Sequence, residues 1–239
     1  MLGLGLGMGV GNKASMLPVS AFPSIDAIPP GALVLDSDGG VKACRWAVEL
    51  NGSDSLRFAT SKPNLSGSDW SLSWLQSDRA ISAVGNRLLN IFDSGKAVLR
   101  LNQIAGGMFR LSLSTDGSTT VAYIDTISPI IDTKFHKFSI EKIGNSIALI
   151  VDGIFATMSI GAWSVLTASI VEFRDSGADL RPLVLANIGQ GDTIYGNDLF
   201  PCTESSGTVI ANTYTPSRPA TLSDPNAHVK ALVPVSLST

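Results

Sequence analysis

The stretch TKFHKFSIEKIGNSIALIVDGIFATM, residues Thr133–Met158, decides the fold because three strand patterns follow one another there across two tight turns. Apolar residues recur at every second position on both sides of the first turn, which places them on one face of each strand. Gly144-Asn145 and Asp152-Gly153 are turn dipeptides. The segment therefore predicts consecutive antiparallel hairpins with one buried face, formed by Phe138, Ile140, Leu149 and Val151.

Outside this segment, short apolar or alternating runs separated by turn signals predict further strands. They are 32–35, 45–50, 55–59, 71–75, 88–92, 98–101, 109–114, 119–124, 137–142, 147–151, 154–158 and 169–173. Asp116-Gly117 reverses the chain between Phe109–Ser114 and the strand containing Val121 and Tyr123, which predicts a second hairpin. No segment sustains a helical apolar period for three turns. The fold class predicted is all-β, an antiparallel β-sandwich.

The aromatic-His start, the alternating strand, the Gly-Asn turn and the Val-Asp-Gly end resemble the "WHHVAV...LYVDG" hairpin of laminin-G-like, concanavalin-type jelly-roll domains. AVELNGSDSLRF at Ala47–Phe58 and WSLSWL at Trp70–Leu75 look like earlier strands of such a domain, and the similar part runs from about Val48 to Ser176. Phe135 replaces the usual Trp and Lys137 the second His, whose role in the family is structural. The resemblance implies a jelly roll, as found in bacteriophage tail, collar or capsid-fibre structural proteins.

Three parts are expected along the chain: residues 1–31 as a Gly/Leu-alternating arm and Pro-rich linker, 32–185 as the sandwich, and 186–239 as a C-terminal extension that packs on the sandwich or on a neighbour. An extended arm would place apolar side chains on one face and bare backbone on the other, which suits a strand pressed into a groove. A disordered or loosely packed tail is the alternative. The residues expected to anchor assembly are Leu2, Gly3, Leu4, Gly5, Leu6, Gly7, Met8, Gly9 and Val10.

The start of the chain fits neither of two common glycine-rich or apolar motifs. It lacks the early positive charge of a secretory signal, because no Lys or Arg precedes Lys13. The G-x-G-x-x-G register of a dinucleotide loop also fails at every start. Near the other end, 188–200 is expected to hold the last sandwich strand or a long loop, and 208–211 and 228–235 are expected to add edge strands.

Composition narrows the classes of partner. Charged residues make up 15% of the chain, hydrophobic residues 44%, and the mean hydropathy is +0.26. A formal net charge of -3 argues against direct nucleic-acid binding. Low surface charge favours a surface covered by copies of the chain or by another protein. A very large core is the alternative explanation.

Residues able to carry chemistry are sparse. Cys44 and Cys202 match no zinc spacing, and they are either small buried residues or a disulfide pair. Only His136 and His228 are present, no catalytic-motif signature occurs, and the glutamates are isolated from one another. The run Asp36-Ser37-Asp38-Gly39 favours an Asx turn over a calcium loop. The four tryptophans are expected in the core rather than stacked on sugars. We therefore expect no enzyme activity, no cofactor and no metal site.

Two functions remain open. The first is a non-enzymatic structural protein of a virus particle, a phage tail, collar or head-fibre component. It would assemble through its terminal arms, with host-surface glycan attachment as an additional role. The alternative is a carbohydrate-binding, lectin-like module of a cell-surface or secreted protein. For the first, the expected partners are copies of the chain, other virion proteins and a host glycan, without nucleic acid or membrane. The expected location is the virion, after synthesis in the host cytoplasm.

Overall fold

The computed structural model describes residues 33–35, 41–50, 54–60, 62–78, 87–130, 136–174, 183–191, 198–200, 204–212 and 215–232. Apart from the short 3-10 turn η3 (Ala105–Gly107), the regular structure in these ranges is β-strand. The strands are β1 (Leu33–Leu35), β2 (Val41–Leu50), β3 (Ser55–Ala59), β4 (Trp70–Asp78), β5 (Arg87–Asp93), β6 (Lys96–Ile104), β7 (Met108–Ser114), β8 (Thr120–Asp125), β9 (His136–Ile143), β10 (Ser146–Val151), β11 (Ile154–Ser159), β12 (Ala168–Arg174), β13 (Leu183–Gly191), β14 (Asp198–Phe200), β15 (Val209–Ile210), β16 (Ala220–Leu222) and β17 (His228–Leu232).

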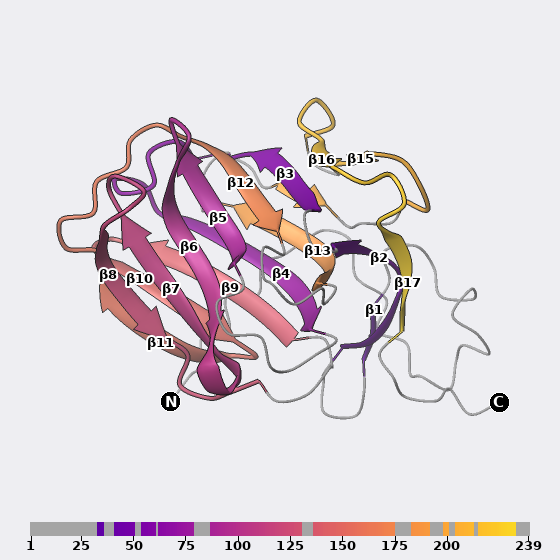
Figure 1. Ribbon diagram of the computed structural model, residues 1–239, viewed down its shortest axis with the longest axis horizontal. Coiled ribbons are helices and arrows are strands. Elements are labelled where there is room, and N and C mark those ends of the chain that lie inside the picture. Colours follow the sequence, from indigo (N-terminus) through magenta and orange to yellow (C-terminus); the bar gives the residue numbers. More distant parts are fainter. Residues whose placement is uncertain are drawn as a thin grey trace, which may run out of the picture.

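The described strands form two antiparallel sheets, which lie one in front of the other in Figure 1. One sheet has nine strands, in the order β1-β2-β13-β4-β9-β10-β11, with β14 paired to β13 and β17 paired to β2. The other has eight strands, in the order β15-β16-β3-β12-β5-β6-β7-β8. The two sheets share one hydrophobic core, so the architecture is an antiparallel jelly-roll β-sandwich. The predicted fold class is confirmed.

The hairpins of the deciding segment form in the predicted register. Leu149 lies opposite Ile140 and Val151 opposite Phe138 across β9 and β10, and all four side chains are buried. Gly144 has a φ of +54°, as a two-residue hairpin turn requires at a glycine. The Asp152-Gly153 turn then joins β10 to β11. The second predicted hairpin is also present, between β7 and β8.

Aromatic side chains from both sheets meet in the core. Trp74 of β4 stacks on Phe138 of β9 with ring centroids 5.4 Å apart. From the other sheet, Phe109 of β7 packs edge-on against Phe138 at 5.0 Å, and Phe173 of β12 packs edge-on against Trp74 at 5.2 Å. Such pairs hold the two sheets face to face. The expectation that tryptophans are core residues is confirmed for Trp70, Trp74 and Trp163, which are all buried.

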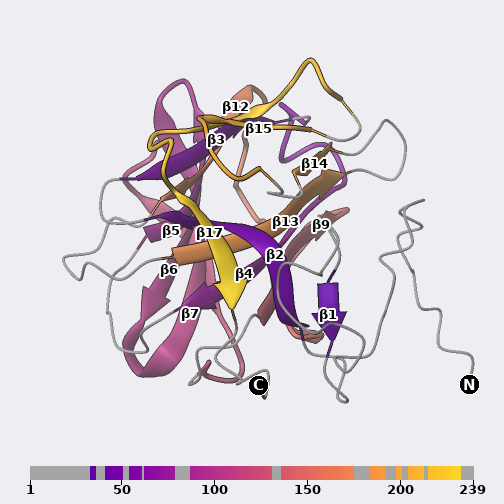
Figure 2. The ribbon, with the colours of Figure 1, turned by 90° about the vertical axis from the view of Figure 1, so that its right-hand side faces the viewer.

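Three features differ from the sequence pattern or extend it. Val121 and Tyr123 of β8 point outward, while Ala122 and Ile124 pack against the core. The strand β13 runs across residue 185, where the sandwich was expected to end. The segment after it adds strands to both sheets, because β16 pairs with β3 and β17 with β2. Figure 2 shows β17 lying beside β2.

Candidate functional site

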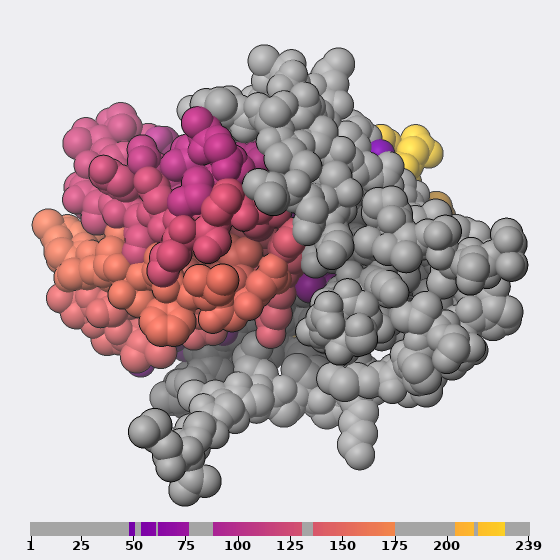
Figure 3. Space-filling view, turned by 90° about the horizontal axis from the view of Figure 1, so that it is seen from below, coloured from indigo at the N-terminus to yellow at the C-terminus, as the bar shows by residue number. Residues whose placement is uncertain are grey.

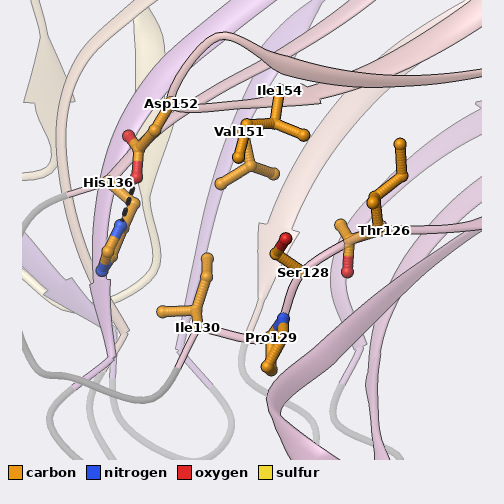
Figure 4. Close-up of a pocket in the computed structure, with 9 residues that line it drawn as sticks. Thr126, Ser128, Pro129, Ile130, His136, Val151, Asp152 and Ile154 are labelled. Carbon is orange, nitrogen blue, oxygen red and sulfur yellow. Dashed lines mark hydrogen bonds and ion pairs between the residues drawn. The ribbon is translucent and has the colours of Figure 1, made fainter.

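A pocket of about 160 Å³ opens on the side of the sandwich where both sheets end, at the edge strands β8 and β11. Its two walls come from the loop after β8 and from the β10–β11 turn, with His136 at the start of β9 beside them (Figure 4). Figure 3 shows, on the face seen from below, the later residues of the sandwich in orange beside earlier ones in pink and magenta. The lining residues are Thr126, Ile127, Ser128, Pro129, Ile130, His136, Val151, Asp152 and Ile154.

The loop wall is held against β7 and η3 by backbone bonds. The Thr126 N–H donates to the Phe109 carbonyl at 2.9 Å, and the Phe109 N–H donates to Thr126 Oγ1 at 3.1 Å. At the other end of the loop, the Ile130 N–H donates to the Gly107 carbonyl at 2.9 Å. Gly107 has a φ of +74°, and a Cβ there would collide with the Ile130 carbonyl. A glycine at 107 is therefore a condition for this wall.

The turn wall is held by the Asp152 carboxylate. Its Oδ1 accepts the Lys137 N–H at 2.8 Å, and its Oδ2 lies 2.6 Å from His136 Nδ1. The Asp152 N–H donates to the Lys137 carbonyl at 2.9 Å. Asp152 has a φ of +50°, a conformation that Asp tolerates better than most residues. These contacts tie the Val-Asp-Gly turn to the His that begins the hairpin.

A His-Asp pair of this kind can orient an imidazole as a general base, provided that a nucleophile is bonded to the other ring nitrogen. Ser128 lines the same pocket, but no hydrogen bond joins it to His136. Figure 4 shows the second ring nitrogen of His136 on the side away from Ser128. In the described chain the pair therefore acts as a clamp between β9 and the β10–β11 turn.

The pocket suits one apolar side chain. Its volume is close to that of the roughly 150 Å³ cavities that hold benzene, and well below the roughly 300 Å³ at which small-molecule sites begin. Val151, Pro129 and Ile130 supply an apolar lining, and Ile127 and Ile154 are exposed beside them, at 65% and 51%. Phe155, the next residue of β11, is also 63% exposed. The pocket and its rim thus present apolar side chains at the surface.

The strand β11 carries no charged residue and no proline, and it is the last strand on its side of the sheet. Among the described strands, only β10 pairs with it. Natural sheets normally protect such edges with charges, prolines or bulges. An unprotected edge beside an apolar pocket is a place where another strand can be added.

The residues expected to carry function fall mostly elsewhere. The arm residues 2–10, the run 36–39 and Cys202 lie outside the described residues. Cys44 lies in β2, opposite Leu33 of β1, and His228 begins β17. His136 begins β9 and contacts the Asp152 carboxylate. Among the described residues, no group of three or more His, Cys, Asp or Glu could hold a metal ion.

Sequence reasoning missed Asp152 as the partner of His136, and it missed the 126–130 loop altogether. The Val-Asp-Gly pattern identified the turn, but its spacing carries no information on which side chain the carboxylate contacts. The sequence also did not reveal the partner of Glu172. Glu172 forms an ion pair with Arg57 on the neighbouring strand β3, and this pair joins the two strands.

No protein-family model matches the sequence, and no curated protein matches it. Among solved structures, the binding domain of botulinum neurotoxin serotype D superimposes with a TM-score of 0.50 at 12% identity, covering 66% of this chain and 41% of that chain. A heptameric SAP-like pentraxin from Limulus polyphemus has a TM-score of 0.46 at 14% identity, covering 61% of this chain and 75% of that chain. At 12% identity, the similarity to the toxin domain shows the β-sandwich fold alone.

The search for a membrane-crossing segment is negative for helices. Within the part of the chain that the structure describes, no helix is long and apolar enough to cross a membrane.

Proposed function

We propose that this chain is a non-enzymatic structural component of a virus particle, a phage tail, collar or head-fibre protein that assembles through its terminal arms. The observation that supports assembly is the uncharged edge strand β11, with Ile154 and Phe155 exposed beside the apolar pocket. Exposed apolar patches of this kind mark contact surfaces between proteins. The low charge of the whole chain points the same way.

The N-terminal arm has the residue pattern expected of a strand that binds at the β11 edge. Its alternating leucines and glycines, in an extended conformation, would place apolar side chains on one face and let a second backbone approach closely on the other. In the proposed assembly, the arm of a neighbouring copy adds to β11 as a further strand. One of its leucines fills the pocket between Ile127 and Ile154. The partners are then copies of the chain and other virion proteins, and the location is the virion.

Arm variants test this assembly. Deleting Met1–Lys13, or making Leu4→Asp together with Leu6→Asp, should abolish homo-oligomer formation or incorporation into the particle. The thermal transition of the body should stay within about 2 °C, because the arm precedes the Pro-rich linker that leads into the sandwich. Light scattering and particle co-purification measure the first result, and calorimetry measures the second.

A second test changes β11, the edge strand to which the arm is proposed to add, and compares one variant there with a control variant elsewhere. Phe155→Lys places a charge on β11 and should block assembly, because a charged edge residue opposes strand addition. Ile143→Lys alters a side chain of similar exposure, 66%, at the end of β9 and should assemble normally. Normal assembly of both the truncated chain and Phe155→Lys would refute the proposed docking.

A lectin-like module is the second candidate, and one observation favours it: Tyr123 is 57% exposed on the outer face of the eight-stranded sheet. Host-glycan attachment is compatible with a role in the particle. Assembly of the purified chain into rings or other closed oligomers without carbohydrate would favour the virion role over a free lectin. On either proposal, we expect no hydrolysis of common polysaccharides.

A further inference from the structure

Tyr123 is part of a three-residue arrangement on the outer face of the eight-stranded sheet. Asp125 accepts two hydrogen bonds from Arg110, from Nε at 2.7 Å and from Nη2 at 2.8 Å. The Arg110 guanidinium carbon in turn lies 4.2 Å from the centre of the Tyr123 ring. The Asp125 hydrogen bond raises the pKa of Arg110, and the Arg110 hydrogen bond lowers the pKa of Asp125. The pair therefore stays charged and fixed over a wide pH range.

This arrangement holds an aromatic ring rigidly and leaves it open. Arg110 covers one face of the Tyr123 ring, yet the residue remains 57% exposed. A ring held by a bidentate Arg-carboxylate fork loses little conformational entropy when it binds a ligand.

Polar side chains of β7 and β8 lie on the same outer face as the ring. Ser112 of β7 lies directly opposite Tyr123, and its side chain is partly exposed. No residue of the described chain bonds the Ser112 hydroxyl or Arg110 Nη1. Both groups can therefore bond a ligand, and so can the second lone pairs of the Asp125 carboxylate.

We propose that Tyr123, Arg110, Asp125 and Ser112 form a glycan-binding platform, on which one face of a sugar ring stacks against Tyr123 while sugar hydroxyls bond Arg110 and Ser112. Tyr123, Arg110 and Ser112 contact the sugar directly. Asp125 is a positioning residue, because it acts by orienting Arg110. The inference rests on the glycan attachment named in the proposed function, and it assigns that attachment to a surface distinct from the β11 edge.

A sugar is the ligand class that this chemistry favours. A pyranose ring has an apolar face of C–H groups and a rim of hydroxyls, so it needs a flat ring with hydrogen-bonding groups beside it. An apolar protein side chain would cover Arg110 Nη1 and the Ser112 hydroxyl without giving either a hydrogen-bond partner, which costs free energy. A sugar satisfies both groups.

The experiment titrates the full chain with hexasaccharides of glucose, N-acetylglucosamine and mannose and measures binding by isothermal titration calorimetry. At least one sugar should bind. Tyr123→Ala should weaken that binding about tenfold, which corresponds to about 1.4 kcal/mol, whereas Tyr123→Phe should retain the ring and most of the affinity. Arg110→Lys should weaken binding several-fold, because Lys cannot form the fork that fixes the ring. Ile143→Ala, which removes an exposed apolar side chain from the other sheet, should bind like the unmodified chain.

The thermal transition of each variant separates binding from folding. Loss of binding by Tyr123→Ala with an unchanged transition supports the platform. Binding of none of the sugars, or undiminished binding by Tyr123→Ala, overturns it, and so does equal weakening by Tyr123→Ala and Ile143→Ala. The assembly measurements on the arm variants are independent of these titrations, so a failed platform and a failed virion role give different results.

Discussion

At the scale of single residues, the adjacent glycines Gly106 and Gly107 differ in whether the structure has room for a side chain. Gly106 and Gly107 both have positive φ, at +76° and +74°. A Cβ on Gly106 would meet nothing within 4 Å, whereas a Cβ on Gly107 would overlap the carbonyl of Ile130. Gly107 alone therefore sets how closely the 126–130 loop approaches η3.

Gly107→Ala should destabilise the protein by clearly more than Gly106→Ala. Both variants carry the cost of a left-handed conformation with a Cβ, about 1–2 kcal/mol. Gly107→Ala must also displace Ile130 and break its hydrogen bond to the Gly107 carbonyl. Denaturant unfolding of the two variants measures the difference. Equal losses of stability would show that the close approach to Ile130 is easily relieved.

Asp125 links the Arg110 fork to the pH dependence of stability. The hydrogen bond from Arg110 lowers the pKa of Asp125 in the folded state, so the folded state favours the charged carboxylate. The resulting stabilisation is fully present above the unfolded pKa of about 3.9 and is lost as the pH falls through the lower folded pKa.

Asp125→Asn should therefore be less stable than the unmodified chain at pH 7, and the gap should narrow below about pH 3.9. Unfolding in urea at a series of pH values measures this gap. A gap that stays constant down to pH 2 would mean that the fork is not the source of the pH dependence.

At the scale of elements, neighbouring strands of one hairpin unit have opposite roles. Leu149 of β10 is 1% exposed and faces the core, whereas Phe155 of β11 faces outward. The strand β10 is paired on both sides, by β9 and β11, while β11 ends the sheet. Two consecutive strands of the chain thus differ in burial because one is interior to the sheet and the other is at its edge.

Leu149→Asp should cost several kcal/mol, because it buries a charge without a partner and removes core packing. Phe155→Asp should change stability by less than about 0.5 kcal/mol, as expected for an exposed position. Unfolding of both variants provides the test. A small loss for Leu149→Asp would contradict the buried face that it shares with Phe138.

At the scale of the whole molecule, the C-terminal segment completes the sandwich. Ile210, Ala220 and Leu222 are buried in the common core, and the Glu49 N–H donates to the Ala227 carbonyl at 2.6 Å. The strands that carry or follow them pair with β3 and β2, which come from the start of the sandwich. The two ends of the described chain therefore stabilise one another.

A chain ending at residue 203 should be less stable by about 3–6 kcal/mol, because the buried side chains of Ile210 and Leu222 each contribute about 1.5–3 kcal/mol. Deleting Met1–Lys13 provides the control, and its transition should remain near that of the full chain. Chemical denaturation measures both. Unchanged stability on truncation at 203 would show that the segment folds as a separate extension.

The sequence by itself determined the strands of the central region and their local pairing. Period-two apolar runs and the Gly144-Asn145 and Asp152-Gly153 turns predict hairpins whose register follows from the turn, because a two-residue loop leaves no freedom for slippage. Asp116-Gly117 lies in a longer loop, so it predicts a hairpin without its register. The burial of Phe138, Ile140, Leu149 and Val151 followed from the same alternation.

Only the tertiary structure decided which face of β8 is buried, where β13 inserts, and which residues meet in the pocket and on the platform. Both faces of β8 carry apolar residues, so alternation alone cannot choose between Tyr123 and Ile124. The strand β13 has glycines and polar residues, yet it lies between β2 and β4. Contacts between segments far apart in the sequence, such as Gly107 with Ile130 or Asp152 with His136, depend on how the sheets pack. A local pattern sets the direction of a side chain relative to its own strand, and only the packing of the whole sandwich sets what lies on that side.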